Sequence, residues 1–324
     1  MNEHNHIDVH VHSLSKKYVD LLQELGAEHE VTRWAREIVA HAEEEGVQRR
    51  LDVMDRSRVE RQILSMSAAT PYFDDAEAGI RAARFINDEH AELCRRYPDR
   101  FSFFATLPMP HVDACLAELD RAIRDLGAVG VTFTTSIRGR SLAEPAFEEV
   151  FAELDRRATV VFLHPPGFSC FSPMIKEHQW TLGAPIEDAV CAMQLMRAGF
   201  PRRYPQLKII LPHLGGFLAF LRYRTSRNAD LAMPTEDKPS VQMRKFWYDT
   251  ASGEPEALRI AATCYGADKL LFGSDYPYWD RDYDVTWQYL EKAGLHPDEL
   301  AAVRSENARA LFGEKLLSAK PATR

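Results

Sequence analysis

The stretch IDVHVH at residues 7–12 alternates apolar and polar residues and ends in a histidine pair, and three later stretches follow a similar design. They read VVFLHPPG at 160–167, LKIILPHLGG at 207–216 and LLFGSDYP at 270–277, so each apolar run ends near a histidine or an aspartate before the chain turns. In a parallel barrel the carboxyl ends of the strands meet at one face, where catalytic residues collect. The pattern therefore predicts a site built from strand-end residues, namely His10, His12, His164, His213 and Asp275.

Runs rich in β-branched and aromatic residues recur along the chain and predict eight strands, at 7–12, 61–66, 101–106, 129–134, 159–164, 207–213, 246–250 and 270–274. Segments with helical periodicity lie between most of them, at 75–97, 112–127, 145–157, 185–199 and 255–266. Alternation of this kind predicts βα crossovers and a parallel sheet. We therefore expect one α/β domain over residues 1–324 with the (β/α)8 TIM-type barrel fold.

Three segments depart from this alternation. Residues 13–60 are long, charged and largely helical, which predicts a helical insertion after the first strand that forms a lid over the active-site face. Residues 225–245 are polar and contain two prolines, which indicates an extended loop between the sixth and seventh strands. The tail at 314–324 is expected to fray.

The overall composition favours a protein that acts on small molecules. Hydrophobic residues make up 45% of the chain and the formal net charge is −8. We expect a large core and no nucleic-acid partner, because nucleic-acid binders concentrate lysine and arginine on one face. The five cysteines form no CxxC pair, which indicates reduced thiols in the cytoplasm. The start MNEHNH does not resemble a signal peptide, and no apolar stretch is long enough to span a bilayer, so no membrane association is expected.

His10 and His12 lie two residues apart on a predicted strand, so their side chains point to the same side. Two imidazole nitrogens in this arrangement can converge on one metal ion. A polar tract with incidental histidines is the alternative, and it suits His4 and His6 better, because they precede the apolar alternation. We expect the later pair to be metal ligands.

His164 and Asp275 can complete the ligand set, since each ends an apolar run. A buried structural histidine and a turn-capping aspartate are the alternative roles. Three neutral imidazoles and one carboxylate suit Zn²⁺ best, with Mn²⁺ as a second candidate. The run GVTFTTS at the end of the fourth strand supplies no lysine for a carbamylated bridge between two metals, so one divalent ion is expected.

His213 lies in LPHLGG, where the paired glycines allow the backbone to approach closely behind it. A hydrogen-bonded structural role is the alternative. Because imidazole titrates near neutral pH, a histidine beside the ion can remove or return a proton. We predict that His213 is catalytic, with Asp275 as a second acid-base candidate.

Together the motifs IDVHVH, ATLPMP, FLHPPG, LPHLGG and LLFGSDYP resemble the amidohydrolase superfamily over roughly residues 6–313. Within it they look most like the branch of 2-amino-3-carboxymuconate semialdehyde decarboxylase and related aromatic-acid decarboxylases. The resemblance implies that the strand-six histidine, here His213, activates water or transfers a proton, and it points to a homodimer. It also implies that one metal ion is bound by His10, His12, His164 and Asp275.

The sequence indicates substrate-binding residues less clearly than it indicates the metal ligands. Trp180, in HQWTLGAPIED, resembles a family tryptophan that lines the substrate pocket, although ordinary packing explains it equally well. Family members hold substrate carboxylates with arginines, and the 13–60 segment offers four unranked candidates: Arg33, Arg36, Arg49 and Arg50. Three further arginines resemble those near a family dimer interface, with a solvated helix face as the alternative: Arg222, Arg224 and Arg227.

The sequence therefore predicts a metal-dependent non-oxidative decarboxylase whose substrate is a small aromatic or unsaturated carboxylic acid. It leaves open whether Asp275 or His213 protonates the carbon that loses its carboxylate, or whether water adds first with His213 as the base. A hydrolase or hydratase acting on a lactone, amide or conjugated acid is the alternative, because one barrel fold hosts many reactions. A binding protein without catalysis is disfavoured, because mere metal binding needs no proton-transfer residue such as His213.

Overall fold

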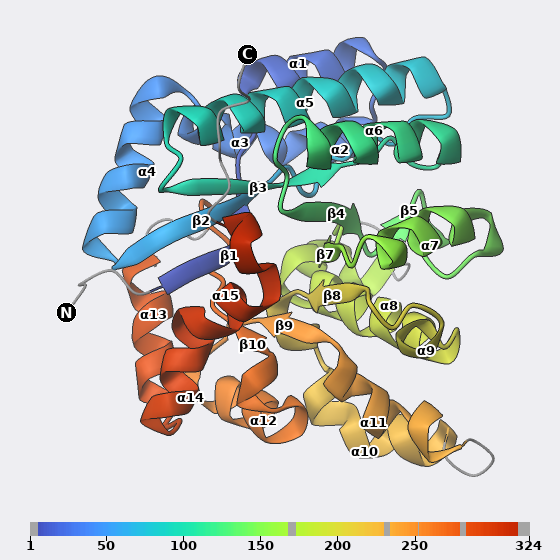
Figure 1. Cartoon of the computed structure of the whole chain (residues 1–324), viewed down its shortest axis with the longest axis vertical. Helices are drawn as coiled ribbons and strands as arrows, with labels where there is room; N and C mark the ends of the chain where they lie inside the picture. Colours follow the sequence, from blue (N-terminus) through green and yellow to red (C-terminus); the bar gives the residue numbers. More distant parts are fainter. Residues whose placement is uncertain (1–5, 168–172, 230–233, 252, 279–282, 317–324) are drawn as a thin grey trace.

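Eight parallel strands form one sheet in the computed structural model, which describes residues 6–167, 173–229, 234–251, 253–278 and 283–316 (Figure 1). The strands follow one another around the sheet in chain order. They are β1 (His6–His12), β2 (Val59–Ser65), β3 (Phe101–Thr106), β4 (Gly130–Thr134), β7 (Val160–His164), β8 (Lys208–Leu211), β9 (Trp247–Asp249) and β10 (Leu270–Leu271). Each overlaps one predicted strand, and the predicted (β/α)8 barrel is confirmed.

Backbone hydrogen bonds between β1 and the segment after β10 join the two edges of the sheet. The Asp275 N–H donates to the His10 carbonyl at 2.8 Å, and the His12 N–H donates to the Tyr276 carbonyl at 2.7 Å. The first and last strands of the barrel therefore hold three of the predicted ligands in a fixed register.

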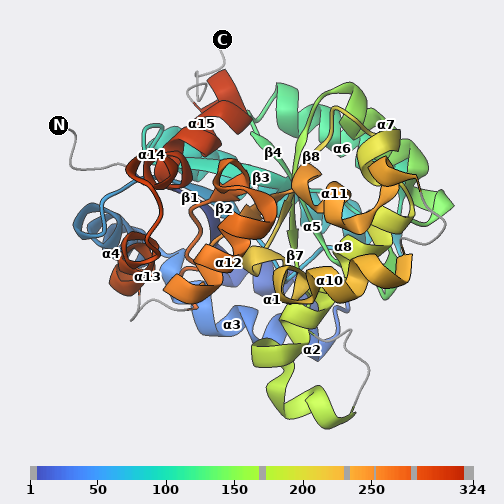
Figure 2. The same ribbon diagram turned by 90° about the horizontal axis from the view of Figure 1, so that it is seen from below.

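Helices surround the strands, as the view from below shows (Figure 2). The predicted helical segments appear as α5 (Ala76–Arg96), α6 (Val112–Arg124), α7 (Glu148–Arg156), α8 (Ala184–Arg197) and α12 (Pro255–Tyr265). Further helices are α10 (Leu218–Ala229), α13 (Tyr283–Lys292), α14 (Pro297–Ala301) and α15 (Asn307–Phe312). Within the described ranges, none of the helices combines the length and apolarity needed to cross a bilayer.

One cluster of buried apolar side chains joins the strands of the barrel to one another. Its strand members are Ile7, Val9, Ile63, Phe104, Val160, Phe162, Ile210 and Leu271. The ring of Phe162 lies edge-on to that of His10, with 5.0 Å between centroids. Apolar packing among the strands therefore directly supports the predicted site.

Residues 13–60 are largely helical, as predicted, but they form two distinct parts. The last part, α4 (Glu44–Arg56), packs on β2 and is the crossover helix that a βα barrel requires. The additional elements are α1 (Lys16–Glu24), α2 (His29–Arg33), α3 (Ala35–Ile38) and the 3-10 turn Val39–His41. Helix α1 packs against α5 (Figure 1). Residues 16–41 are therefore the insertion.

The expectation of an extended loop over residues 225–245 is wrong. Helix α10 runs to Ala229 instead of giving way to a loop, and short helical turns follow it, including α11 (Pro239–Gln242). Pro239 stands at the start of α11, where a helix needs no N–H from that residue. At the tail, Gly313–Leu316 forms a 3-10 turn and Leu316 is buried, and fraying of the rest of the tail stays a prediction. Residues 317–324 lie outside the described ranges.

Candidate active site

Four strand-end side chains converge at the carboxyl end of the barrel. They belong to His10, His12, His164 and Asp275, all buried, and one ligand atom from each lies within 4.8 Å of the others. Asp275 Oδ1 lies 2.8 Å from His12 Nε2 and 3.3 Å from His10 Nε2. The structure thus brings together all four residues predicted to bind a metal.

The hydrogen bonds of this cluster leave imidazole nitrogens free for an ion. His10 Nδ1 lies 2.9 Å from Asp249 Oδ2, and His164 Nδ1 lies 2.8 Å from the Pro165 carbonyl oxygen. A proton on each Nδ1 satisfies these acceptors and leaves Nε2 as the ligand atom. His10 Nε2 is buried and has no hydrogen bond within the described ranges. Three imidazoles and a carboxylate are donors typical of a divalent first-row ion, so these residues fit one.

Burial and nearby charge set the protonation states of the cluster. Burial lowers the pKa of His12 and holds that of His164 well below its usual range, which favours neutral imidazoles. Burial alone would raise the pKa of Asp275, but the charge of His10, whose Nε2 lies 3.3 Å away, holds that pKa far below the ordinary value. Burial alone would lower the pKa of His10, but Asp249 and Asp275 raise it to about 9. The carboxylates around His10 therefore favour a cation at this position.

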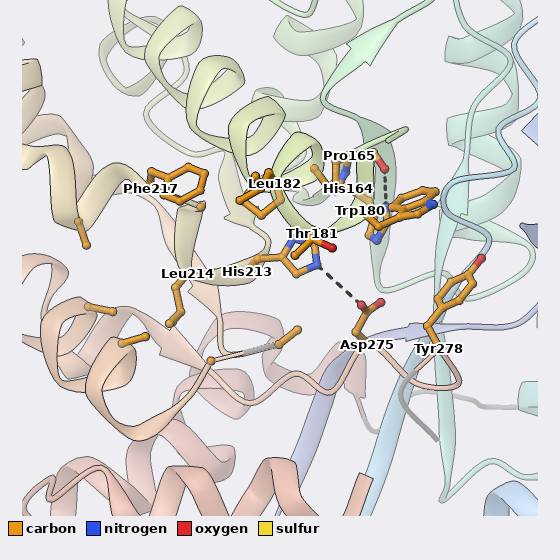
Figure 3. Close-up of a pocket in the computed structure, with 18 of the residues that line it drawn as sticks. His164, Pro165, Trp180, Thr181, Leu182, His213, Leu214, Phe217, Asp275 and Tyr278 are labelled. Atoms are coloured by element: carbon orange, nitrogen blue, oxygen red, sulfur yellow. Dashed lines mark hydrogen bonds and ion pairs between the residues drawn. The ribbon is translucent and has the colours of Figure 1, made fainter. Parts of the chain in front are cut away.

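His213 stands beside the cluster on the turn after β8. Its Nε2 lies 3.9 Å from Asp275 Oδ2, as the dashed line in Figure 3 marks, and its Nδ1 lies 2.9 Å from Asp188 Oδ2. Its backbone N–H donates to Asp249 Oδ1 at 3.0 Å. Burial would lower the pKa of His213, but Asp188 raises it well above the ordinary value. Two carboxylates therefore fix the imidazole with Nε2 toward Asp275.

The turn that carries His213 depends on its two glycines. Gly215 and Gly216 adopt positive φ angles of 72° and 60°. A Cβ at Gly216 would lie 2.0 Å from the carbonyl oxygen of Pro185 on α8. The glycine therefore lets the turn approach α8 closely, and α8 is the helix that supplies Asp188. The close backbone approach predicted from LPHLGG is confirmed.

A cavity of about 810 Å³ opens next to the cluster. Figure 3 places Trp180 and Tyr278 on one side of Asp275, with Leu214 and Phe217 on the other. Most of the lining is apolar or aromatic: Trp34, Pro165, Trp180, Leu182, Leu214, Phe217, Ile260 and Tyr278. Such a lining suits a flat apolar ring.

Trp180 lies on the wall of this cavity, and its role in binding substrate stays a prediction. It belongs to the short π-helical turn Gln179–Gly183 before α8. A Cβ on Gly167 would lie 2.4 Å from its ring, so the indole rests directly on the backbone that follows His164. Its ring also meets that of Trp34 edge to face, with 5.6 Å between centroids. The insertion therefore contributes to the same aromatic wall.

The comparisons with known proteins agree with this geometry. A family model described as Amidohydrolase matches residues 7–313. The chain belongs to the amidohydrolase family. Gamma-resorcylate decarboxylase of Rhizobium sp. (strain MTP-10005) is 31% identical to it, over 81% of this chain and 86% of the relative. The 2-amino-3-carboxymuconate-6-semialdehyde decarboxylase of Dictyostelium discoideum is 26% identical, over 84% and 81% of the two chains.

A solved structure resembles this amidohydrolase over almost its whole length. It is a dihydroxybenzoic acid decarboxylase from Polaromonas sp. JS666 with bound manganese and the inhibitor 2-nitroresorcinol, at a TM-score of 0.80 and 25% identity. The match covers 96% of this chain and 97% of that one. The predicted family, with its branch of aromatic-acid decarboxylases, is confirmed.

The arginines predicted to hold the substrate carboxylate do not lie in the cavity lining that the structure describes. Arg50 is fully buried away from the cavity and donates to the His12 carbonyl at 2.6 Å, so it supports β1 instead of holding a substrate. Arg33 stacks on Trp34, and Arg36 pairs with Asp20 at 3.0 Å. Within the described ranges, no arginine or lysine lines the cavity, so none of the four candidates is placed as a clamp for the substrate carboxylate.

The strand-end pattern did not single out the two carboxylates that orient the histidines. Asp249 ends β9, so the signal that marks Asp275 was present there too. Asp188 lies in the interior of α8, within an ordinary helical sequence. Only its contact with His213 in the folded chain marks Asp188 as part of the site.

Proposed function

We propose that this amidohydrolase is a metal-dependent non-oxidative decarboxylase of an aromatic carboxylic acid. The observation that carries the proposal is the convergence of three histidines and an aspartate, with His213 beside them, next to an apolar cavity. The named activities of the relatives that match most of the chain support the same reaction.

The metal would be held by His10, His12, His164 and Asp275. This ligand set favours Zn²⁺, which we propose as the native ion, and the manganese in the Polaromonas decarboxylase supports Mn²⁺ as the second candidate. When bound, the ion supplies positive charge that orients the acid and stabilises the negative charge that develops as carbon dioxide leaves.

His213 and Asp275 form the proton-transfer pair of the proposed reaction. Loss of carbon dioxide breaks the bond between the ring carbon and the carboxylate carbon, and the ring carbon keeps the electron pair and takes up a proton. Asp188 holds the His213 imidazole through Nδ1, which directs Nε2 toward Asp275 and the cavity. This arrangement supports His213 and Asp275 as the groups that deliver that proton, and the apolar walls strengthen their charge interactions.

Carbon dioxide release from hydroxybenzoic acids tests the proposal. The protein is stripped with a chelator, reloaded separately with Zn²⁺ or Mn²⁺, and assayed for bound metal by mass spectrometry. We expect one ion per chain and carbon dioxide release only after reloading. We also expect His213→Asn to keep its metal and lose turnover. Turnover confined to lactones or amides would contradict decarboxylation and favour a hydrolase.

We further propose that the protein forms a homodimer through the face of α10. Phe220 and Tyr223 on this helix are 81% and 74% exposed, and exposed apolar clusters are typical of protein interfaces. The same helix carries Arg222, Arg224 and Arg227, all exposed. Light scattering should give a dimer for the wild type and a monomer for Phe220→Glu. A wild-type monomer would contradict the proposal.

We also propose a cytoplasmic location. The four described cysteines, Cys94, Cys115, Cys191 and Cys264, form no disulfide, which supports a reducing compartment. Cys170 lies outside the described ranges. Fractionation of cells that express the protein at its native level should place it with cytoplasmic markers.

A further inference from the structure

Polar side chains are scarce in the cavity once the metal-binding cluster and His213 are set aside. Among the described residues, the remaining polar side chains of the lining are those of Glu37, Thr181 and, through its hydroxyl, Tyr278. Since no lysine or arginine joins them in the described lining, Glu37 brings a negative charge that no cation of the wall neutralises. A cavity that takes an acid therefore carries a carboxylate of its own.

Glu37 lies on α3, in the insertion. Its side chain is exposed, and within the described ranges it has no hydrogen bond or ion pair. The neighbouring Arg36 is engaged elsewhere, with Asp20 on α1. The Glu37 carboxylate is therefore available to a molecule in the cavity.

Glu37 is held next to aromatic side chains of the same wall. Its backbone N–H donates to the Trp34 carbonyl at 3.1 Å, and the Trp34 ring meets that of Trp180. Glu37 and Tyr278 both line the cavity, and after burial and Asp275 the charge of Glu37 is a further cause of the raised pKa of Tyr278. The other face of this wall reaches the metal-binding cluster, because the Tyr278 ring lies 5.2 Å from that of His12.

We propose that Glu37 selects the substrate by accepting a hydrogen bond from a hydroxyl or amino group on the ring, and that it excludes rings with a second carboxylate there. The substrate class is then an aromatic monocarboxylic acid with a hydrogen-bond donor on the ring edge turned away from the metal-binding cluster. This inference rests on the proposed function, because it assumes that the departing carboxylate occupies the cluster.

The chemistry of a carboxylate explains both the preference for a hydrogen-bond donor and the exclusion of a second carboxylate. An ionised carboxylate can only accept hydrogen bonds, so a hydroxyl satisfies it and a methoxy group does not. A second carboxylate on the ring would meet a like charge. Because Glu37 is exposed to solvent, screening limits each preference to about tenfold.

Matched ring acids test the proposal. The panel is 2-hydroxybenzoate and its derivatives with one added hydroxyl, methoxy or carboxylate group at ring position 3, 4 or 5. For the wild type we expect one position at which kcat/KM for the hydroxyl derivative exceeds that for the methoxy derivative by about tenfold, with the dicarboxylate poorest. Glu37→Gln should reduce this ratio to about twofold and improve the dicarboxylate by about tenfold. Each ratio is taken within one variant and relative to its own kcat/KM for 2-hydroxybenzoate, so that a uniform change in activity cancels.

Glu24→Gln is the matched control, because it removes the same charge from the exposed end of α1 in the insertion, outside the cavity lining. It should keep the wild-type ratios. Equal ratios in the wild type and Glu37→Gln, or one uniform change over the whole panel, would overturn the proposal.

Equilibrium binding separates this inference from the proposed function. Quenching of tryptophan fluorescence reports on binding without turnover, since Trp34 and Trp180 line the cavity. If no acid releases carbon dioxide but the binding ratios shift in Glu37→Gln as described, decarboxylation fails and the selection by Glu37 stands. If carbon dioxide is released and neither kinetic nor binding ratios shift, decarboxylation stands and the selection by Glu37 fails.

Discussion

The cluster of strand-end residues and the aromatic wall of the cavity are held in place by different means. In the cluster, His10 is buried and bonded to Asp249, and the adjacent His213 is bonded to Asp188. On the wall, Glu37 is exposed and belongs to a helix of four residues. The difference teaches that the barrel fixes the proposed reacting groups, whereas the insertion can change the proposed recognition residue without disturbing the strands.

Loss of a cluster histidine should produce the largest effect. His12→Ala removes one imidazole from the predicted ligand set, so we expect bound metal to fall from one ion per chain to near zero and kcat/KM to fall on the order of 10³-fold. Metal analysis and carbon dioxide release measure both. Full activity after this change, with the ion retained, would show that the cluster is not the catalytic centre.

The two orienting carboxylates should have separable effects. Asp249→Asn weakens the hold on His10 Nδ1, so metal affinity should fall about 10- to 100-fold. Asp188→Asn releases His213, so kcat should fall by a similar factor while metal affinity stays within about threefold of the wild type. Metal titration and steady-state kinetics on the same two variants distinguish these outcomes. Equal losses of metal affinity in both would contradict separate roles.

A change on the wall should act on substrate binding. Trp34→Ala removes one of the two rings that meet edge to face, so KM should rise about tenfold with kcat within about threefold of the wild type. Bound metal should not change. A fall in kcat as large as that of Asp188→Asn would contradict a role of the wall in substrate binding alone.

The smallest expected effect is on the pH dependence of folding stability, through two buried histidines that lie outside the proposed site. Burial lowers the pKa of His6 and His90 to about 4 from 6.5. Well above pH 6.5 neither residue affects stability, and as the pH falls through 6.5 toward 4 the unfolded chain binds protons that the folded chain excludes. Each should lower the free energy of unfolding by about 1 kcal/mol between pH 7.5 and 6. Urea titrations should show that His90→Gln removes its share, and an unchanged pH dependence would contradict this.

Strand-end residues of the barrel could be predicted because each apolar run delivers a polar side chain to one face. His164 and Asp275 carry that signal in the sequence, and the structure brings them together. Asp188 could not be predicted, because its partner lies 25 residues away across a close contact between α8 and a turn. Glu37 carries no local signal either, because only folding of the insertion brings a solvated helix residue to the cavity.

The bond between His12 and Asp275 joins side chains 263 positions apart in the chain. During synthesis, His12 must therefore wait for 263 further residues before its carboxylate partner is made. Closure of so long a loop is entropically costly and slow. Tight capture of an ion should therefore mark a finished molecule, and truncated or nicked chains should release metal before they lose most of their secondary structure.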